Sequence, residues 1–140
     1  MLDLPNSKVI KHRPLARKSA LIVDDQQDIR QLIMMTLEIG DFELHEASNG
    51  DSALSMAFDL QPTVVLLDAM MPGGLNGFDV CRRIKDDSVL KRTTKVVLLT
   101  AMSQTSDLKR GKAAGCDAYL IKPFSPIELL DTVDRLVSDD

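Results

Sequence analysis

The fold of this 140-residue chain is constrained most by short apolar runs that alternate with segments of helical periodicity. The runs cover residues 21–23, 64–67, 96–99 and 119–121, and the runs at 64–67 and 96–99 contain only Val and Leu. Continuous apolar runs of this length are typical of strands that are buried on both faces. Their alternation with helical segments predicts a parallel sheet covered by helices on both sides.

Apolar spacing predicts the helices and one further strand. Residues 42–47 alternate apolar and polar side chains, which indicates a strand at the edge of the sheet. The first helix should end at Gly40, and the last should begin at Ser125, with Glu128 completing a capping box. The expected apolar faces of the five helices are Ile29, Leu32, Ile33, Thr36 and Leu37; Ala53, Leu54, Ala57 and Phe58; Phe78, Cys81 and Ile84; Leu108, Ala113 and Ala114; and Ile127, Leu130, Val133 and Val137.

These elements predict an α/β fold of flavodoxin-like, doubly wound type, with five βα units and strand order 2-1-3-4-5. In such sheets ligands bind outside the carboxyl ends of the strands, where the strand order reverses. With this order the binding point lies between the first and third strands.

Bulk properties indicate a soluble globular domain, since 44% of the residues are hydrophobic and 27% are charged. No run of 18 apolar residues is present, so we expect no membrane span, and the N-terminus lacks the apolar core of a signal peptide. Cys81 and Cys116 fit no metal-binding spacing and suggest free thiols in a reducing compartment. We therefore expect a cytoplasmic protein.

Charge divides the chain into a basic arm at residues 1–18 and an acidic remainder. The arm holds Lys8, Lys11, Arg13, Arg17 and Lys18 against Asp3 alone, while the whole chain has a net charge of −4. An acidic body argues against direct binding to nucleic acid. We expect the arm to be partly disordered, as chain termini commonly are, and residues 19–138 to form one domain with no output domain attached.

Polar groups follow the buried runs directly. Asp24 and Asp25 follow the run at 21–23, Asp68 follows the run at 64–67, Thr100 the run at 96–99 and Lys122 the run at 119–121. The carboxyl ends of parallel strands meet at one edge of a sheet, so these side chains should gather there.

Three neighbouring carboxylates raise one another's pKa unless a cation compensates them, and Mg²⁺ is bound by such groups together with water and phosphate. Lys122 and Thr100 can each bind a phosphoryl oxygen, and Asp68 is placed to be the nucleophile. The set therefore indicates Mg²⁺-assisted phosphoryl transfer to an aspartate.

The chain resembles the receiver domain of response regulators in two-component signalling over about residues 19–138. The resemblance rests on Val23-Asp24-Asp25 with Arg30, Asp68-Ala69-Met70-Met71-Pro72, Gly77, Thr100-Ala101, Tyr119, and Lys122-Pro123-Phe124. The resemblance implies that Asp24, Asp25, Asp68 and the backbone carbonyl of Met70 hold Mg²⁺. It also implies that Asp68 accepts a phosphoryl group from a phosphohistidine on a sensor kinase or phosphotransfer protein.

The same resemblance implies a switch. Thr100 and Lys122 would bind the phosphoryl group, and Tyr119 would rotate inward as Thr100 moves. The surface of the fourth helix, fifth strand and fifth helix would change for a partner protein to read. A cis Lys122-Pro123 bond is implied as well. Such a domain catalyses only its own phosphorylation and dephosphorylation, and it is not otherwise an enzyme.

Two features depart from the family pattern. The loop from Pro72 to Gly77 has one residue more than is usual and contains Gly73 and Gly74, which suggests a longer, more mobile loop. The positions that tune autodephosphorylation in the family are occupied by Met70 and Met102. We expect these apolar side chains to slow hydrolysis of the aspartyl phosphate.

Three alternatives remain at the level of sequence. A flavodoxin-type electron carrier is disfavoured because residues 24–28 would repel a flavin phosphate. A Mg²⁺-dependent phosphatase of haloacid-dehalogenase type would need a second acid where Met70 stands. A receiver-like module without phosphorylation is the third. The downstream partner, the pathway and the oligomeric state, monomer or phosphorylation-dependent dimer, are left open by the sequence.

Overall fold

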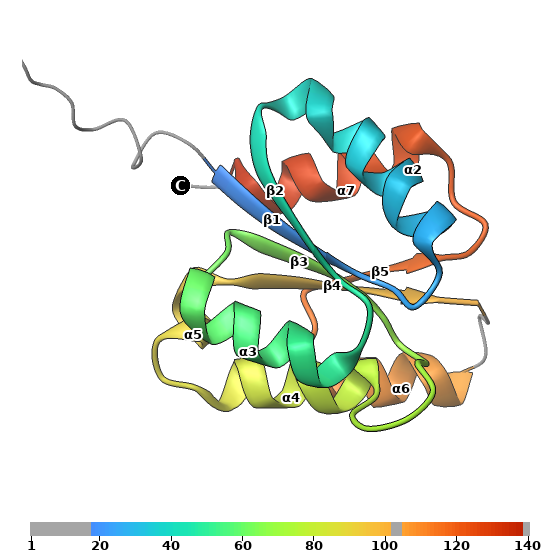
Figure 1. Ribbon diagram of the computed structural model, residues 1–140. Coiled ribbons are helices and arrows are strands. Elements are labelled where there is room, and N and C mark those ends of the chain that lie inside the picture. The colour runs from blue at the N-terminus through green and yellow to red at the C-terminus, as the bar shows by residue number, and fades with distance from the viewer. Residues whose placement is uncertain (1–17, 102–104, 139–140) are drawn as a thin grey trace, which may run out of the picture.

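The protein was analysed as a computed structural model, which describes residues 18–101 and 105–138. It contains one five-stranded parallel sheet with helices on both faces (Figure 1). The strand order is β2-β1-β3-β4-β5, as the sequence predicts. The strands are β1 (Lys18–Val23), β2 (Phe42–Ala47), β3 (Val64–Asp68), β4 (Lys95–Thr100) and β5 (Ala118–Ile121).

The helices divide between the two faces of the sheet. α2 (Gln27–Leu37) and α7 (Pro126–Val137) lie on one face, while α3 (Gly50–Leu60), α4 (Gly77–Asp86) and α6 (Thr105–Ala114) cover the other (Figure 1). A short 3₁₀ helix, η1 (Glu38–Gly40), follows α2, and a four-residue helix, α5 (Leu90–Thr93), precedes β4. Within the described residues no helix is both long and apolar enough to cross a bilayer.

The apolar strands fill two cores because successive side chains point to opposite faces of a sheet. In β3, Val65 and Leu67 join the core under α3, α4 and α6, while Val64 and Leu66 join the core under α2 and α7. All four side chains are fully buried. β2, by contrast, is at the edge and exposes Glu43 and Glu46, as its alternating sequence predicts.

Some helix boundaries differ from those predicted from the sequence. α2 ends at Leu37, so the predicted end at Gly40 is wrong, and the left-handed residue is Asp41, with φ of 59°. α5 was not predicted. The capping box of Ser125 and Glu128 at the start of α7 is confirmed.

Four predicted core positions are wrong, because Leu32, Phe58, Ala113 and Ile127 are exposed. Phe58 of α3 is 45% exposed and Ile127 of α7 is 78% exposed. In α7 it is Leu129, which was not predicted, that is fully buried. These errors concern the border of an apolar stripe, where a helical repeat alone does not show which residue meets the sheet.

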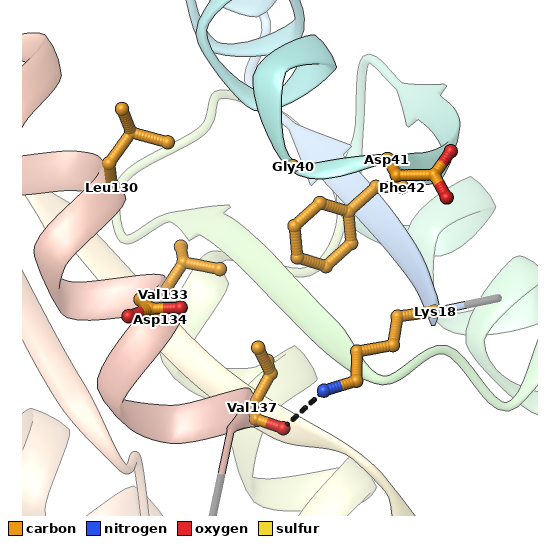
Figure 2. Close-up of a pocket in the computed structure, with 8 residues that line it drawn as sticks. All are labelled: Lys18, Gly40, Asp41, Phe42, Leu130, Val133, Asp134 and Val137. Carbon is orange, nitrogen blue, oxygen red and sulfur yellow. Dashed lines mark hydrogen bonds between the residues drawn. The ribbon is translucent and has the colours of Figure 1, made fainter. Parts of the chain in front are cut away.

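The N-terminal boundary lies one residue earlier than expected, because Lys18 is already part of β1. Its Nζ donates to the carbonyl of Val137 at 2.7 Å, which ties the end of α7 to the start of the sheet (Figure 2). Phe42, Leu130 and Val133 border the same small hollow. This hollow lies at the amino end of β1, away from the carboxyl strand ends. Residues 1–17 of the basic arm lie outside the described part of the chain.

Candidate functional site

The predicted polar residues meet at the carboxyl ends of β1, β3, β4 and β5. Carboxylate oxygens of Asp24, Asp25 and Asp68 all lie within 4.8 Å of one another. Asp24 is fully buried, Asp68 is 7% exposed, and Asp25 is exposed. The parallel register places these groups together, since Val23 pairs with Leu67 directly before Asp24 and Asp68.

Lys122 joins the carboxylates from the end of β5. Its Nζ lies 2.8 Å from Asp24 Oδ2 and 3.7 Å from Asp68 Oδ1. The peptide bond from Lys122 to Pro123 is cis, as the family resemblance implies. The backbone N–H of Lys122 donates to the carbonyl of Thr100 at 2.7 Å, so the ends of β4 and β5 are held together beside the acidic cluster.

The backbone and a neighbouring arginine hold the two buried acids. The Gln26 N–H donates to Asp24 Oδ1 at 2.9 Å, and the Met70 N–H donates to Asp68 Oδ1 at 3.3 Å. Arg30 of α2 donates from Nη1 to the Asp24 carbonyl at 2.8 Å and from Nε to Glu46 at 2.7 Å. Arg30 therefore connects the end of β1 to β2, a role that its place in the sequence motif did not disclose.

The charge balance of this cluster is unfavourable for an ionised Asp68. Burial raises the pKa of Asp68 from its ordinary 3.8 to about 6, the nearby Lys122 ammonium opposes the rise, and the Asp24 charge adds to it. One ammonium thus faces three carboxylates. A hard divalent cation with oxygen ligands would restore the balance, and this donor set suits Mg²⁺.

The acids border an open hollow of about 520 Å³. Thr100, at the end of β4, is 5% exposed and borders it, as does Met70, which is 59% exposed. Sequence reasoning missed three further lining residues, namely Gln26, Asp107 and Arg110. Asp107 and Arg110 are one turn apart on α6, and this spacing was the signal available in the sequence.

Of the predicted switch and tuning residues, the structure describes all but Met102. Tyr119 is half-buried, and its hydroxyl donates to the carbonyl of Leu108. A Cβ on Gly111 would lie 2.6 Å from the Tyr119 ring, so this glycine lets the ring pack against α6. Met102 lies outside the described residues.

Glycines shape the loop that follows Asp68. Gly73 and Gly74 have φ of 72° and 44°, conformations that other residues adopt only with strain. A Cβ on Gly74 would also lie 2.4 Å from Asp51 Oδ2. The two glycines are therefore required by the path of the loop, while its expected mobility stays a prediction.

Comparison with known proteins identifies the family of the chain. The model of the response regulator receiver domain matches residues 20–134. The chain belongs to the response regulator receiver family. The receiver domain is 39% identical over 117 residues to the transcriptional regulatory protein ResD of Bacillus subtilis and 38% identical to SrrA of Staphylococcus aureus. These matches cover 84% of this chain but only 47% and 46% of the relatives, so the chain spans about half their length.

Solved receiver structures have the same fold. The chemotaxis protein CheY4 of Vibrio cholerae superposes with a TM-score of 0.79 at 32% identity, over 86% of this chain and 98% of that one. A response regulator of Chloroflexus aurantiacus gives a TM-score of 0.81 at 29% identity, over 87% and 98% of the two chains. The flavodoxin-like fold and the family predicted from the sequence are confirmed.

Proposed function

We propose that this receiver domain accepts a phosphoryl group on Asp68 from a phosphohistidine of a sensor kinase or phosphotransfer protein. The observation that carries the proposal is the meeting of Asp24, Asp25 and Asp68 within 4.8 Å, with Lys122 against the two buried acids. Such a set of charges is costly to maintain and serves no packing purpose. Membership of the receiver family supports the same conclusion.

Asp24, Asp25 and Asp68 would hold Mg²⁺, with the Met70 carbonyl as a further proposed ligand. When bound, the ion supplies positive charge that compensates the carboxylates and the phosphoryl oxygens. The exposed Asp25 leaves the cluster open toward the hollow. The ion is therefore expected to exchange readily with solvent.

In the transfer, an Asp68 carboxylate oxygen forms a bond to phosphorus while the phosphorus–nitrogen bond of the donor breaks. The electron pair of that bond leaves with the imidazole nitrogen. Lys122 and Thr100 border the place where the phosphoryl oxygens would lie, and each offers a donor to one of them. Most of the catalysis is thus positioning and charge compensation by groups that the fold already holds together.

The output of the reaction would pass through α6, β5 and α7. Thr100 pairs with Ile121 of β5, and Tyr119 of the same strand donates to the Leu108 carbonyl of α6, so a change at Thr100 would be passed to both elements. The curated relatives are transcriptional regulators. Their names suggest control of transcription as the downstream process, through a partner protein that reads this surface.

Phosphorylation is tested by incubating the protein with acetyl phosphate and MgCl₂ and measuring its intact mass. We expect the gain of one phosphoryl group, abolished by Asp68→Asn and by EDTA. Asp59→Asn, an exposed acid on α3, is the matched control and should behave as the wild type. If the wild type gains no mass, or Asp68→Asn gains it equally, the proposed acceptor is wrong.

A further inference from the structure

Arg110 borders the phosphoacceptor hollow from α6, together with Asp68, Thr100 and Lys122. It is exposed, and its guanidinium carbon lies 4.1 Å from the centroid of the Phe78 ring. Within the described part of the chain, this ring contact is the interaction that the structure gives Arg110, with no ion pair or hydrogen bond to a carboxylate. The guanidinium thus keeps its N–H donors available at the rim of the hollow.

The ring beneath Arg110 is held rigidly. Phe78 is 5% exposed and directly follows Gly77, whose N–H donates to the Ala69 carbonyl at 2.9 Å. Gly77 packs directly against the backbone of Asp68. The stacking platform for Arg110 is therefore fixed to the strand end that carries the acceptor, and a stacked guanidinium is confined to that side of the hollow.

Lys122 does not make this second cation redundant. Its ammonium is 2.8 Å from Asp24 and 3.7 Å from Asp68, so its charge is already shared between two buried acids. An incoming phosphoryl group brings further negative charge to a hollow that Asp25, Asp68 and Asp107 also border. A cation without a carboxylate partner is suited to meet that charge, and a guanidinium can donate two parallel hydrogen bonds to phosphate oxygens.

We propose that Arg110 is a second cationic contact for the phosphoryl group, which draws the donor into the hollow and orients it for attack by Asp68. This inference rests on the proposed phosphorylation of Asp68. It assigns a role to a residue of α6 that lies outside the acid, hydroxyl and lysine set at the strand ends.

The neighbouring Lys109 provides a matched control. It is exposed on the same helix and carries the same charge, yet it does not border the hollow, since successive helical residues point about 100° apart. Replacing either residue by alanine changes the net charge of the domain equally. A difference between the two variants therefore reports the position of the cation and excludes a general electrostatic effect.

The test measures the second-order rate constant for phosphorylation by acetyl phosphate with saturating MgCl₂, using intact mass. Arg110→Ala should lower the rate constant about two- to fivefold, the range of an exposed charge contact. Arg110→Lys should recover a large part of the loss, Arg110→Gln should not, and Lys109→Ala should match the wild type. Far-UV circular dichroism confirms that each variant is folded.

The inference is overturned if Arg110→Ala reacts at the wild-type rate, if Lys109→Ala loses as much, or if Arg110→Gln recovers the rate as well as Arg110→Lys. The last result would mean that packing on Phe78, and not charge, matters. These results are separate from failure of the proposed function, which would appear as a wild-type protein that gains no phosphoryl group at all.

Discussion

Gly77 packs so closely against Asp68 that a Cβ atom at position 77 would lie 2.1 Å from the Asp68 carbonyl oxygen. The same atom would lie 2.7 Å from the Cα of Ala69. Because both opposing atoms belong to the backbone, neither can turn aside. The start of α4 can therefore pack against the end of β3, which carries the candidate acceptor, only with glycine at position 77.

Gly77→Ala should accordingly lower the free energy of unfolding by about 1–3 kcal/mol, the usual cost of overpacking. It should also weaken binding of Mg²⁺, because Asp68 must move. Urea unfolding with and without MgCl₂ measures both effects. Gly73→Ala is the comparison, since its Cβ would meet no atom within 4 Å although its φ is 72°. It should lose stability from backbone strain but keep the response to Mg²⁺, and equal responses in both variants would contradict the explanation.

The raised pKa of Asp68 should make stability depend on pH in the absence of metal. Burial holds this pKa at about 6, against about 3.9 in an unfolded chain. Between these values the folded protein binds more protons than the unfolded chain, so the free energy of unfolding decreases as the pH rises from about 4 to about 6. The decrease is complete above the folded pKa.

Asp68→Asn cannot ionise and should escape this loss. Its free energy of unfolding relative to the wild type should be about 1–3 kcal/mol more favourable at pH 7.5 than at pH 4.5, measured by urea unfolding in EDTA. Asp59→Asn should show no such change between the two pH values. A constant difference between Asp68→Asn and the wild type at both pH values would show that Asp68 ionises without penalty.

Magnesium should stabilise the domain, because a ligand that binds only the folded state shifts the unfolding equilibrium. Addition of 10 to 100 times the dissociation constant should raise the free energy of unfolding by about 1.4–2.7 kcal/mol. Asp25→Asn should reduce this gain while leaving the fold intact, since Asp25 is exposed. KCl at matched ionic strength is the control, and an equal gain with KCl would indicate simple charge screening.

A partly buried ion pair joins α4 to the segment before β5. Lys85 Nζ lies 2.7 Å from Asp117 Oδ2 and donates to the Thr94 carbonyl at 2.9 Å. The side chains of this pair are 15% and 23% exposed. Removal of one partner of such a pair leaves the other charge poorly solvated.

Lys85→Met should therefore destabilise the domain by about 2–4 kcal/mol. Arg135→Met removes the pair of Arg135 with Asp131, whose side chains are 70% and 69% exposed, and should cost less than about 0.5 kcal/mol. Thermal and urea unfolding of the two variants make the comparison. Similar losses would mean that burial does not distinguish these pairs.

The sequence was sufficient for the sheet and for the edge that carries the candidate site because both depend on local patterns. Runs such as Val64 to Leu67 can be strands buried on both faces, and parallel pairing then brings Asp24 and Asp68 together without any knowledge of side-chain packing. The strand order 2-1-3-4-5 was predicted as that of a flavodoxin-like doubly wound sheet, and the structure confirms it. The positions of ion pairs and loops cannot be read from a repeating pattern of this kind.

What the sequence could not show depends on contacts between distant elements. Ile127 and Leu129 differ in burial because Leu129 packs into the core under α2 and α7 while Ile127 faces solvent. The start of α5 is held by Asp87, which accepts hydrogen bonds from the backbone of Val89 and Leu90. Arg110 borders the site because α6 packs beside α4, where Phe78 supports it. Each of these features depends on packing between elements that are distant in the sequence.

Met70 is expected to influence the lifetime of the phosphoryl group. Its side chain borders the hollow two residues after Asp68 and is 59% exposed. An apolar side chain there can neither hydrogen-bond nor orient a water molecule for attack on phosphorus. We therefore expect Met70→Asn to accelerate loss of the phosphoryl group about tenfold, because an amide can orient the attacking water through one hydrogen bond of about 1.4 kcal/mol.

The rate is measured by intact mass after removal of acetyl phosphate, with Met102→Glu examined in the same way because the family resemblance pairs the two positions. Met35→Asn is the control, since Met35 is 67% exposed on α2 and does not border the hollow. Unchanged rates in Met70→Asn and Met102→Glu would mean that these side chains do not limit hydrolysis. If Met35→Asn also lost the phosphoryl group faster, the effect would be a general one of the added amide, because Met35 does not border the hollow.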